Sequence, residues 1–310
     1  MHRPRAAGVP LAGTRAEPAT WQPRWYAHPY NRAEVYRLAA ALAWLPRPLR
    51  LRLAAVVGRL AASRLPAERA AARRTLGVVT GATGRGLDAL AGRLFAEYAM
   101  CFSDLLSTNR LPPGRRLAHV ESIAGSEHLE RLQGAVISLT AHVGNWDLAG
   151  RLLAGKSARP TNVVVAVEEA RALESWLRRD GDGVRFVPRA QPTVSLTLLA
   201  ALRRGEVVAM QGDRALGSRG DVPVSFFGRP APFPVGPFRL ARAAGVPVVP
   251  AFCTLGPGRR YTVTVLSPLA IGPGDEDAGL RTWVAALERL VQERPTQWFN
   301  FFDIWDPFRA

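Results

Sequence analysis

Apolar residues recur at helical spacing through the first third of the chain, over residues 33–110. Val35, Leu38 and Leu42 fall on one helical face, and a second run over residues 51–65 resumes the period with arginines interspersed. The pattern predicts two basic amphipathic helices. Such helices suit a membrane interface, and they equally suit two helices that cover a sheet, so both interpretations stay open at this point.

After residue 114 the pattern changes to short β-branched runs that alternate with helical stretches. Five runs have the length and composition of strands, at residues 135–139, 162–167, 184–187, 206–210 and 246–252. This alternation predicts an α/β fold with a largely parallel, buried sheet flanked by helices.

These changes of pattern divide the chain into three regions. Residues 1–32 are rich in proline and arginine and lack an apolar period, which predicts a flexible basic tail. We expect residues 33–118 to form a helical region that could lie against a membrane. Residues 119–310 are expected to form the α/β core.

The positive charge is concentrated near the amino terminus. The chain has a formal charge of +16, and residues 1–74 carry fourteen arginines against three glutamates, which gives 14 − 3 = +11. A basic region of this kind favours an anionic partner: a phospholipid surface, an acidic carrier protein or a nucleic acid. Nucleic acid is the weaker candidate because no binding motif accompanies the charge. A merely solvated basic face is the other alternative.

The sequence contains no run of 18 or more apolar residues, so we expect any membrane contact to be peripheral. Cys101 and Cys253 are the only cysteines and could form at most one disulfide. No cysteine pair has the spacing of a metal site, and we expect neither a metal nor a bound cofactor. A reducing compartment is the simpler expectation.

A histidine and an acid follow the first predicted strand, in HVGNWD at residues 142–147. Asn145 can cap the helix that begins there. Asp147, across the turn from His142, could hydrogen-bond one imidazole nitrogen and leave the other free to accept a proton, as a general base does. A structural histidine at a strand end is the alternative. No G-x-S-x-G motif or catalytic-thiol pattern offers a nucleophile, so such a base would activate a hydroxyl of the substrate.

A second polar cluster follows the strand predicted at residues 206–210. Asp213 could orient a polyol and Arg214 could grip a phosphate, although a charged turn explains both residues as well. The adjacent aromatics Phe226 and Phe227 could line a fatty-acyl pocket or lie in the core. The aromatic segment QWFNFFDIW at residues 297–305 predicts a last strand that closes the core, with contact to a lipid chain or interface as the second alternative.

One motif points to a different chemistry. GRLLAGKS at residues 150–157 fits the phosphate-binding loop of nucleotide hydrolases and contains Lys156, the only lysine. That loop must follow a strand and open a helix, whereas here a helical run precedes it and a strand-like run follows. Nucleotide hydrolysis is therefore the less favoured alternative.

Three blocks in order, HVGNWDLAG at 142–150, the glycine- and aromatic-rich stretch 205–252 and QWFNFFDIW at 297–305, resemble the bacterial lipid A late-acyltransferase family. That family lies within the lysophospholipid and glycerolipid acyltransferases, and it has relatives that acylate phosphatidylinositol mannosides. The resemblance runs from about residue 120 to the end and implies a glycerolipid-acyltransferase-like fold.

The resemblance implies an enzyme at the cytoplasmic face of the bacterial inner membrane, peripherally attached. It would move a fatty acyl chain from acyl carrier protein or coenzyme A to a hydroxyl of a lipid or glycolipid. His142 and Asp147 match the family's catalytic dyad. The residues expected to contact substrate are Asn145, Arg178, Arg179, Asp213, Arg214, Phe226, Phe227 and Arg229.

Two departures from lipid A enzymes favour a glycolipid acceptor over lipid A: an aspartate at the second dyad position, and no predicted amino-terminal span. A rival from another class is a non-catalytic basic protein that binds membranes or nucleic acid.

Overall fold

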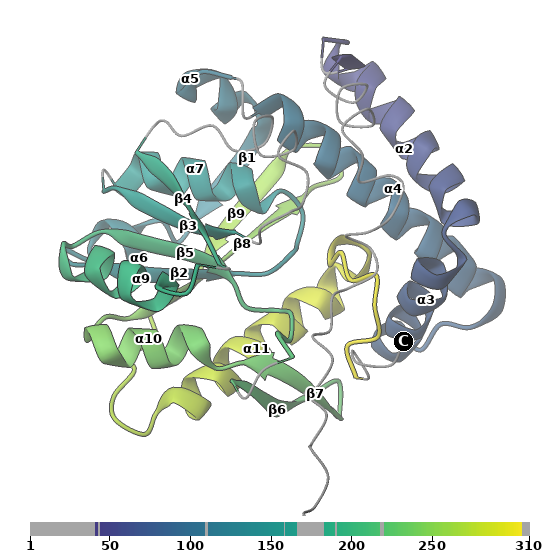
Figure 1. Ribbon diagram of the computed structural model, residues 1–310. Coiled ribbons are helices and arrows are strands. Elements are labelled where there is room, and N and C mark those ends of the chain that lie inside the picture. The colour runs from purple at the N-terminus through teal and green to yellow at the C-terminus, as the bar shows by residue number, and fades with distance from the viewer. Residues whose placement is uncertain are drawn as a thin grey trace, which may run out of the picture.

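A seven-stranded, mostly parallel sheet with helices on both faces forms the centre of the computed structural model (Figure 1). The structure describes residues 41–305 except 43, 109–110, 158, 166–182, 190 and 218–219. The predicted α/β class with a largely parallel sheet is confirmed. The expected tail at 1–32 lies outside the described residues.

The strand order in the sheet is β1-β9-β8-β2-β5-β3-β4. Within this sheet, as far as the structure describes it, only the β8–β9 pairing is antiparallel. The strands are β1 (Val120–Ala124), β2 (Val136–Thr140), β3 (Thr161–Val165), β4 (Val184–Pro188), β5 (Val207–Gln211), β8 (Val248–Leu255) and β9 (Tyr261–Val265). A separate antiparallel hairpin pairs β6 (Asp221–Phe226) with β7 (Arg229–Pro234).

The central strands are buried on both faces, because successive side chains of a strand point to opposite sides. In β2, Val136 belongs to the apolar cluster on one face, and Ile137 and Leu139 belong to the cluster on the other. In β8, Val249 and Phe252 divide in the same way. This two-sided burial explains why the strands appear in the sequence as continuous apolar runs.

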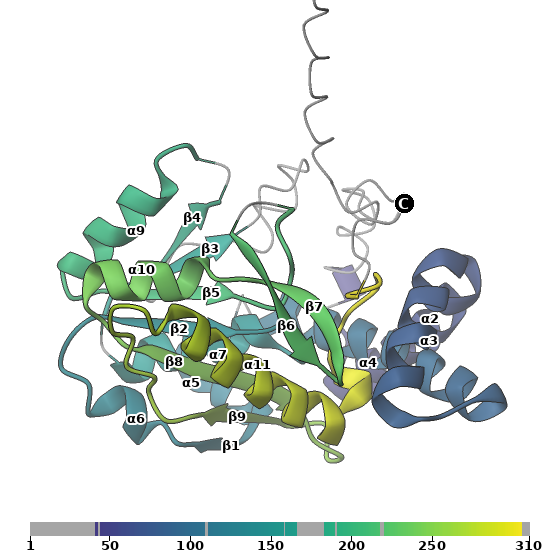
Figure 2. The same cartoon turned by 90° about the horizontal axis from the view of Figure 1, so that it is seen from below.

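Different helices cover the two faces (Figures 1 and 2). On one side lie α7 (Trp146–Ser157) and α4 (Gly84–Thr108), and on the other lie α9 (Val194–Arg203), α10 (Gly236–Ala244) and α11 (Glu276–Glu293). The short elements are α5 (Pro113–Arg116), η2 (Leu117–His119), α6 (Glu127–Glu130) and η3 (Pro295–Gln297). Trp283 of α11 is fully buried in the larger cluster.

The amino-terminal helices α2 (Arg47–Arg64) and α3 (Pro66–Thr80) pack beside α4, at the edge of the molecule (Figure 2). Gly58 permits the close contact of α2 with α4, because a Cβ at this position would lie 2.4 Å from the carbonyl oxygen of Phe95. The described part of this region is largely helical, whereas Val35 and Leu38 of the first predicted helix lie outside the described residues. Helix α2 packs on α4 rather than directly covering the sheet.

The carboxyl-terminal aromatic segment does not form the predicted strand. Among the described residues after η3, only Trp298 makes a β-bridge, with Val143. Trp298 and Phe299 are nevertheless buried, so the segment does close the core. Its compact path comes from side-chain contacts: the Gln297 amide bonds both backbone groups of Leu255, at 2.7 and 2.6 Å.

Two further expectations concern the cysteines and the membrane. Cys101 and Cys253 are buried and free of a disulfide. Within the described part of the chain, each helix is too short or too polar to cross a bilayer.

Candidate active site

His142 lies in the loop between β2 and α7, and the carboxyl-terminal segment holds this loop in place. Phe299 N–H donates to the His142 carbonyl at 2.9 Å, and Gly144 N–H donates to the Gln297 carbonyl at 3.1 Å. Gly144 has φ 54°, and a Cβ there would lie 2.1 Å from the Cys253 carbonyl oxygen. Only glycine fits this turn, which fixes where the His142 side chain emerges.

The carboxylate that orients the imidazole comes from Asp213, 71 residues further along the chain. Asp213 Oδ1 lies 2.8 Å from His142 Nδ1, and Oδ2 accepts the His142 backbone N–H at 3.1 Å. The indole Nε1–H of Trp298 donates to the same Oδ2 at 2.9 Å. The pairing arises because β2 and β5 are adjacent and in register, with Thr140 opposite Gln211. The loops that follow them therefore meet at the carboxyl edge of the sheet.

The charges around this pair favour an ionised aspartate and a neutral histidine. Burial alone would raise the pKa of Asp213, but His142, Arg214 and the Trp298 N–H together bring it far below the ordinary value of 3.8. Burial lowers the pKa of His142 and the charge of Arg214 lowers it further, which outweighs the opposite effect of Asp213. A neutral imidazole with its proton on Nδ1, facing Asp213, has its lone pair on Nε2.

The role predicted for Asp147 is therefore corrected. Asp213, rather than Asp147, contacts His142 Nδ1, while Asp147 Oδ2 accepts a hydrogen bond from Arg151 Nε at 3.0 Å. Asp147 and Arg151 are four residues apart on α7, so their side chains meet on one helix face. The short spacing in the sequence favoured Asp147, but the helix turns its carboxylate toward Arg151.

His142 faces a large cavity with a volume of about 940 Å³, within the range of small-molecule pockets. Its side chain keeps 19% of its surface exposed, while Asp213 behind it keeps 2%. Trp146 stands edge-on to the imidazole, with ring centroids 5.2 Å apart. The polar wall includes Asp147, Arg151, Asp213 and Arg214, and the apolar wall includes Leu53, Val57, Val163, Val165, Phe186, Leu198 and Leu199.

Arg214 and Asn145 have clear positions in the site. Arg214 lines the cavity, donates to the Phe299 carbonyl at 3.3 Å and lies over the Phe302 ring. Asn145 is fully buried, and its Oδ1 accepts the Leu148 N–H, which confirms the expected cap of α7. Asn145 is not among the residues that line the cavity, so the geometry supports a structural role instead of the predicted substrate contact.

The aromatic turn after β6 does not form the acyl pocket that was predicted for it. Phe226 is fully buried, where it packs against Trp298 with ring centroids 5.4 Å apart, and neither Phe226 nor Phe227 lines the cavity. Arg229 lies outside the cavity, 5.7 Å from the Trp305 ring. Arg178 and Arg179 lie outside the described residues.

The structure also excludes the phosphate-binding loop. GRLLAGKS lies within helix α7, and Lys156 pairs with Glu130 at 3.2 Å, so no strand–loop–helix exists there. The sequence interpretation missed the contact of Trp298 with Asp213, because it expected the aromatic segment to close the core or, second, to contact a lipid. The place of Trp298 in the third block of the family resemblance was the one available signal.

The chain is similar in sequence to known proteins. The family model described as bacterial lipid A biosynthesis acyltransferase matches residues 34–306. Phosphatidylinositol mannoside acyltransferase of Mycobacterium tuberculosis (strain CDC 1551 / Oshkosh) is 28% identical over 240 residues, covering 75% of this chain and 74% of the relative. The protein of that name from Mycolicibacterium smegmatis is 25% identical over 242 residues, covering 75% of this chain and 78% of the relative.

A solved structure is also similar. The 1-acyl-sn-glycerophosphate acyltransferase PlsC from Thermotoga maritima has a TM-score of 0.40 and 16% identity, and the match covers 82% of this chain and 99% of that chain. The family match spans nearly the whole chain and contains the cavity, His142 and Asp213. This chain belongs to the bacterial lipid A biosynthesis acyltransferase family and is a lipid acyltransferase.

Proposed function

We propose that this enzyme transfers a fatty acyl chain from an acyl thioester to a hydroxyl of a lipid or glycolipid, with His142 as the general base. The observation that carries the proposal is the position of His142, whose Nδ1 lies 2.8 Å from Oδ1 of buried Asp213 and whose side chain faces a cavity of about 940 Å³. The two mycobacterial relatives are named for a glycolipid acceptor, which supports a sugar hydroxyl of a lipid as the nucleophile.

The reaction follows from the positions of these groups. The acceptor oxygen attacks the thioester carbonyl while its proton passes to His142 Nε2, and the carbonyl electrons move onto oxygen. Asp213 stays ionised and stabilises the imidazolium. The guanidinium of Arg214, in the same cavity, places positive charge near the developing oxyanion. Collapse of the intermediate expels the thiolate, which takes the proton back from His142.

The acyl chain would lie against the apolar wall of the cavity. Val163, Phe186 and Leu198 belong to three different elements, and all three line the cavity that His142 faces. An alkyl chain buried there gains about 0.8 kcal/mol for each CH₂ removed from water. The polar and apolar walls of one cavity thus suit a substrate with a reactive headgroup and a long tail.

Transfer of a labelled chain tests the proposed function. Purified enzyme, a radiolabelled palmitoyl thioester and a bacterial glycolipid extract should yield labelled lipid and one free thiol for each ester formed. Lys156→Ala, on the outer end of α7, should keep this activity and serves as the matched control. Thiol release with no labelled lipid, or neither product from folded enzyme, would contradict the proposal.

The acid limb of the pH profile provides a prediction about His142. Because burial and Arg214 lower its pKa, kcat/KM should be constant above neutrality and fall only below pH 6.5, as the base becomes protonated. Arg214→Gln removes one of the two effects that lower the pKa of His142, so the acid limb of this variant should move to higher pH. Initial rates measured with several overlapping buffers check both positions. A wild-type limb above pH 6.5 would contradict this account.

A membrane surface is the partner that we propose for α2. Its side chains at positions i, i+4, i+7, i+8 and i+11 are apolar and exposed: Leu49 53%, Leu53 38%, Val56 50%, Val57 52% and Leu60 63%. The opposite face is the one packed on α4. The exposed arginines on this helix, Arg52, Arg59 and Arg64, would meet anionic headgroups.

The apolar face of α2 also continues into the cavity. Leu53 and Val57 belong to both, and the exposed Leu196 and Leu216 lie on the cavity wall as well. A bilayer against this rim would bury apolar side chains that are otherwise in water. It would also let a lipid acceptor reach His142 without crossing water. This arrangement supports peripheral binding to an anionic phospholipid bilayer, the expected location of the enzyme.

Charge placed on this face should abolish the binding. Val56 and Leu60 do not line the cavity, so Val56→Glu/Leu60→Glu changes the surface only. We expect at least about a tenfold loss of partitioning to phosphatidylglycerol vesicles, since fully burying one such side chain contributes about 1.5–3 kcal/mol. Thr282→Glu/Ala285→Glu, exposed on α11, adds the same charge elsewhere and should bind as the wild type does. Equal cosedimentation of both variants would refute the docking surface.

A further inference from the structure

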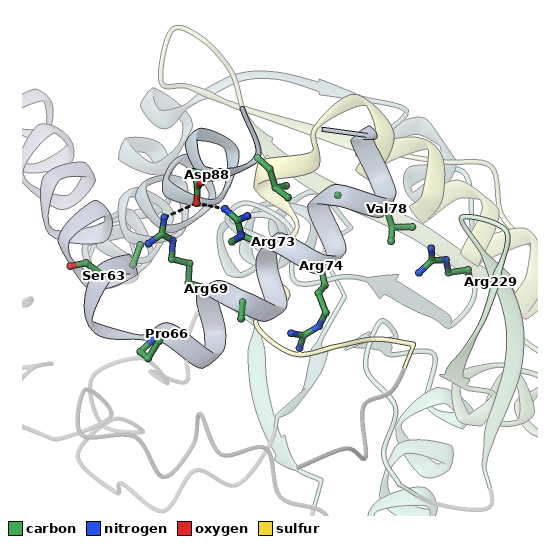
Figure 3. A pocket seen from close by; sticks show the side chains of 12 residues that line it. Ser63, Pro66, Arg69, Arg73, Arg74, Val78, Asp88 and Arg229 are labelled. Atoms are coloured by element: carbon green, nitrogen blue, oxygen red, sulfur yellow. Dashed lines mark hydrogen bonds and ion pairs between the residues drawn. The ribbon is translucent and has the colours of Figure 1, made fainter. Parts of the chain in front are cut away.

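A second hollow lies outside the active-site cavity, on the surface formed by α3, the start of α4 and the start of β7 (Figure 3). Its volume is about 910 Å³. We call it the arginine groove, because Arg69, Arg73 and Arg74 of α3 and Arg229 of β7 line it. No part of the acyltransfer mechanism uses these four residues.

The arginine groove is strongly basic, and three of its arginines pair with carboxylates, Arg69 and Arg73 with Asp88 and Arg74 with Asp303. Four arginines and Asp88 give the lining a formal charge of 4 − 1 = +3. Arg69 Nη2 lies 2.7 Å from Asp88 Oδ1, and Arg73 Nη1 bonds the same oxygen, as the dashed lines in Figure 3 show. A guanidinium has five N–H donors, so arginines held in this way can still receive further carboxylates.

The groove and the active-site cavity share a wall at the junction of α2 and α3. Leu65 lines the cavity and its neighbour Pro66 lines the groove. In the same way, Ala61 lines the cavity and Ala62 lines the groove. A ligand in the groove would therefore lie directly behind the wall of the cavity that His142 faces.

The carboxyl-terminal segment forms a second connection between the two sites. Trp298 bonds Asp213, while Asp303 pairs with Arg74 at 3.0 Å. Trp298 and Asp303 are five positions apart, so their Cα atoms lie at most about 18 Å apart. Phe302 of the same segment lines the cavity. The segment that bonds Asp213 in the active site thus also borders the groove.

The shape of the groove favours a helix over a nucleotide. Ala70, which lies between Arg69 and Arg73 on α3, and Gly77, which follows Arg74, are small and leave room for another helix to approach. The described lining residues include no aromatic ring on which an adenine base could stack. Acidic residues of an approaching helix would meet a row of guanidinium groups, which bind carboxylates in a bidentate manner.

We propose that the arginine groove docks an acidic helix of the carrier protein that delivers the acyl thioester. This inference rests on the proposed function, since it names the source of the acyl chain. The groove receives the donor, and the apolar face of α2 receives the lipid acceptor.

A comparison of two donors tests the proposal. For full-length enzyme, kcat/KM is measured with palmitoyl-acyl carrier protein and with palmitoyl-CoA, at low and at physiological salt. Arg69→Gln/Arg73→Gln should lower the carrier-to-CoA ratio about tenfold or more and flatten the salt dependence with the carrier. Arg281→Gln/Arg289→Gln, exposed on α11, removes the same charge and should leave the ratio as in the wild type. An unchanged ratio in the groove variant would overturn the proposal.

A binding measurement tests the docking site even if Arg69→Gln/Arg73→Gln is inactive or poorly folded. A photo-crosslinker on Ser63→Cys, at the exposed rim of the groove, should capture unacylated carrier protein, and one on Thr282→Cys of α11 should not. Capture without turnover of either donor would refute the proposed function and leave the docking site standing. No capture at Ser63 would refute the docking site. The docking site would also be refuted if Arg69→Gln/Arg73→Gln lost binding to anionic vesicles but kept binding to carrier protein.

Discussion

Asp213→Asn is expected to lower kcat by about 10²- to 10⁴-fold, the range of a lost general base. Asp213 Oδ2 accepts two N–H groups, from the His142 backbone and from Trp298, while Oδ1 faces His142 Nδ1. An asparagine would put its oxygen where the two donors are, so its NH₂ group would face Nδ1. The imidazole would then carry its proton on Nε2, the atom that must accept one.

Two other variants make this prediction specific. His142→Ala sets the activity that remains without any base, and Asp213→Asn should approach it. Asp147→Asn should reduce kcat much less, because Asp147 pairs with Arg151 at the cavity wall. Single-turnover rates and the thermal midpoint of each variant separate chemistry from folding. If Asp147→Asn is as severe as His142→Ala while Asp213→Asn stays active, the orienting carboxylate is Asp147 instead.

The sequence was sufficient to predict five of the seven strands of the sheet and the two polar loops of the site, whereas β1 and β9 were not predicted as strands. Each of the five predicted runs coincides with a strand of the sheet within a few residues, because strands buried on both faces are continuously apolar. His142 and Asp213 were both located just after such strands. The carboxyl edge of a parallel sheet is where ligands bind, which made both loops candidates for the site.

The pairing of His142 with Asp213 could not be predicted, since it depends on strand order. β2 and β5 are neighbours with 71 residues between the two side chains, and no local pattern indicates which strands lie side by side. The same limit applies to Phe226, whose sequence context suits a core and a pocket equally. A spacing of four or five residues can be recognised directly in a sequence, and His142 and Asp147 are five positions apart. The sequence therefore favoured Asp147 as the partner of His142.

The interpretation of the second amino-terminal helix was open for a different reason. Its apolar residues were assigned to one face, whereas α2 has an apolar face on each side: Leu51, Ala55 and Ala62 are buried, and the face with Val56 and Leu60 is exposed. Periodicity alone cannot say which of two apolar faces meets the protein. The decisive feature is tertiary, because Gly58 lets only one face approach α4.

Asp104→Ala is expected to lower the free energy of unfolding by about 3–5 kcal/mol, as removal of one partner from a buried ion pair does. Asp104 of α4 is fully buried and accepts hydrogen bonds from Arg47 Nη2 and Arg50 Nη2, both at 2.7 Å, and from the Tyr261 hydroxyl at 3.0 Å. These contacts join α2, α4 and β9. Alanine would leave the buried Arg50 guanidinium without its counter-charge.

Asp88→Ala is the matched control, because Asp88 lies on the same helix and also holds two arginines, but keeps 42% of its side chain exposed. Water screens such a pair, so its loss should change stability far less. Urea unfolding measures both variants, and hydrogen exchange should show α2 opening first in Asp104→Ala. Because Leu53 and Val57 of α2 line the cavity, loosening of this helix should also raise KM for the lipid substrate. Equal destabilisation by the two variants would mean that the buried cluster adds nothing beyond a surface ion pair.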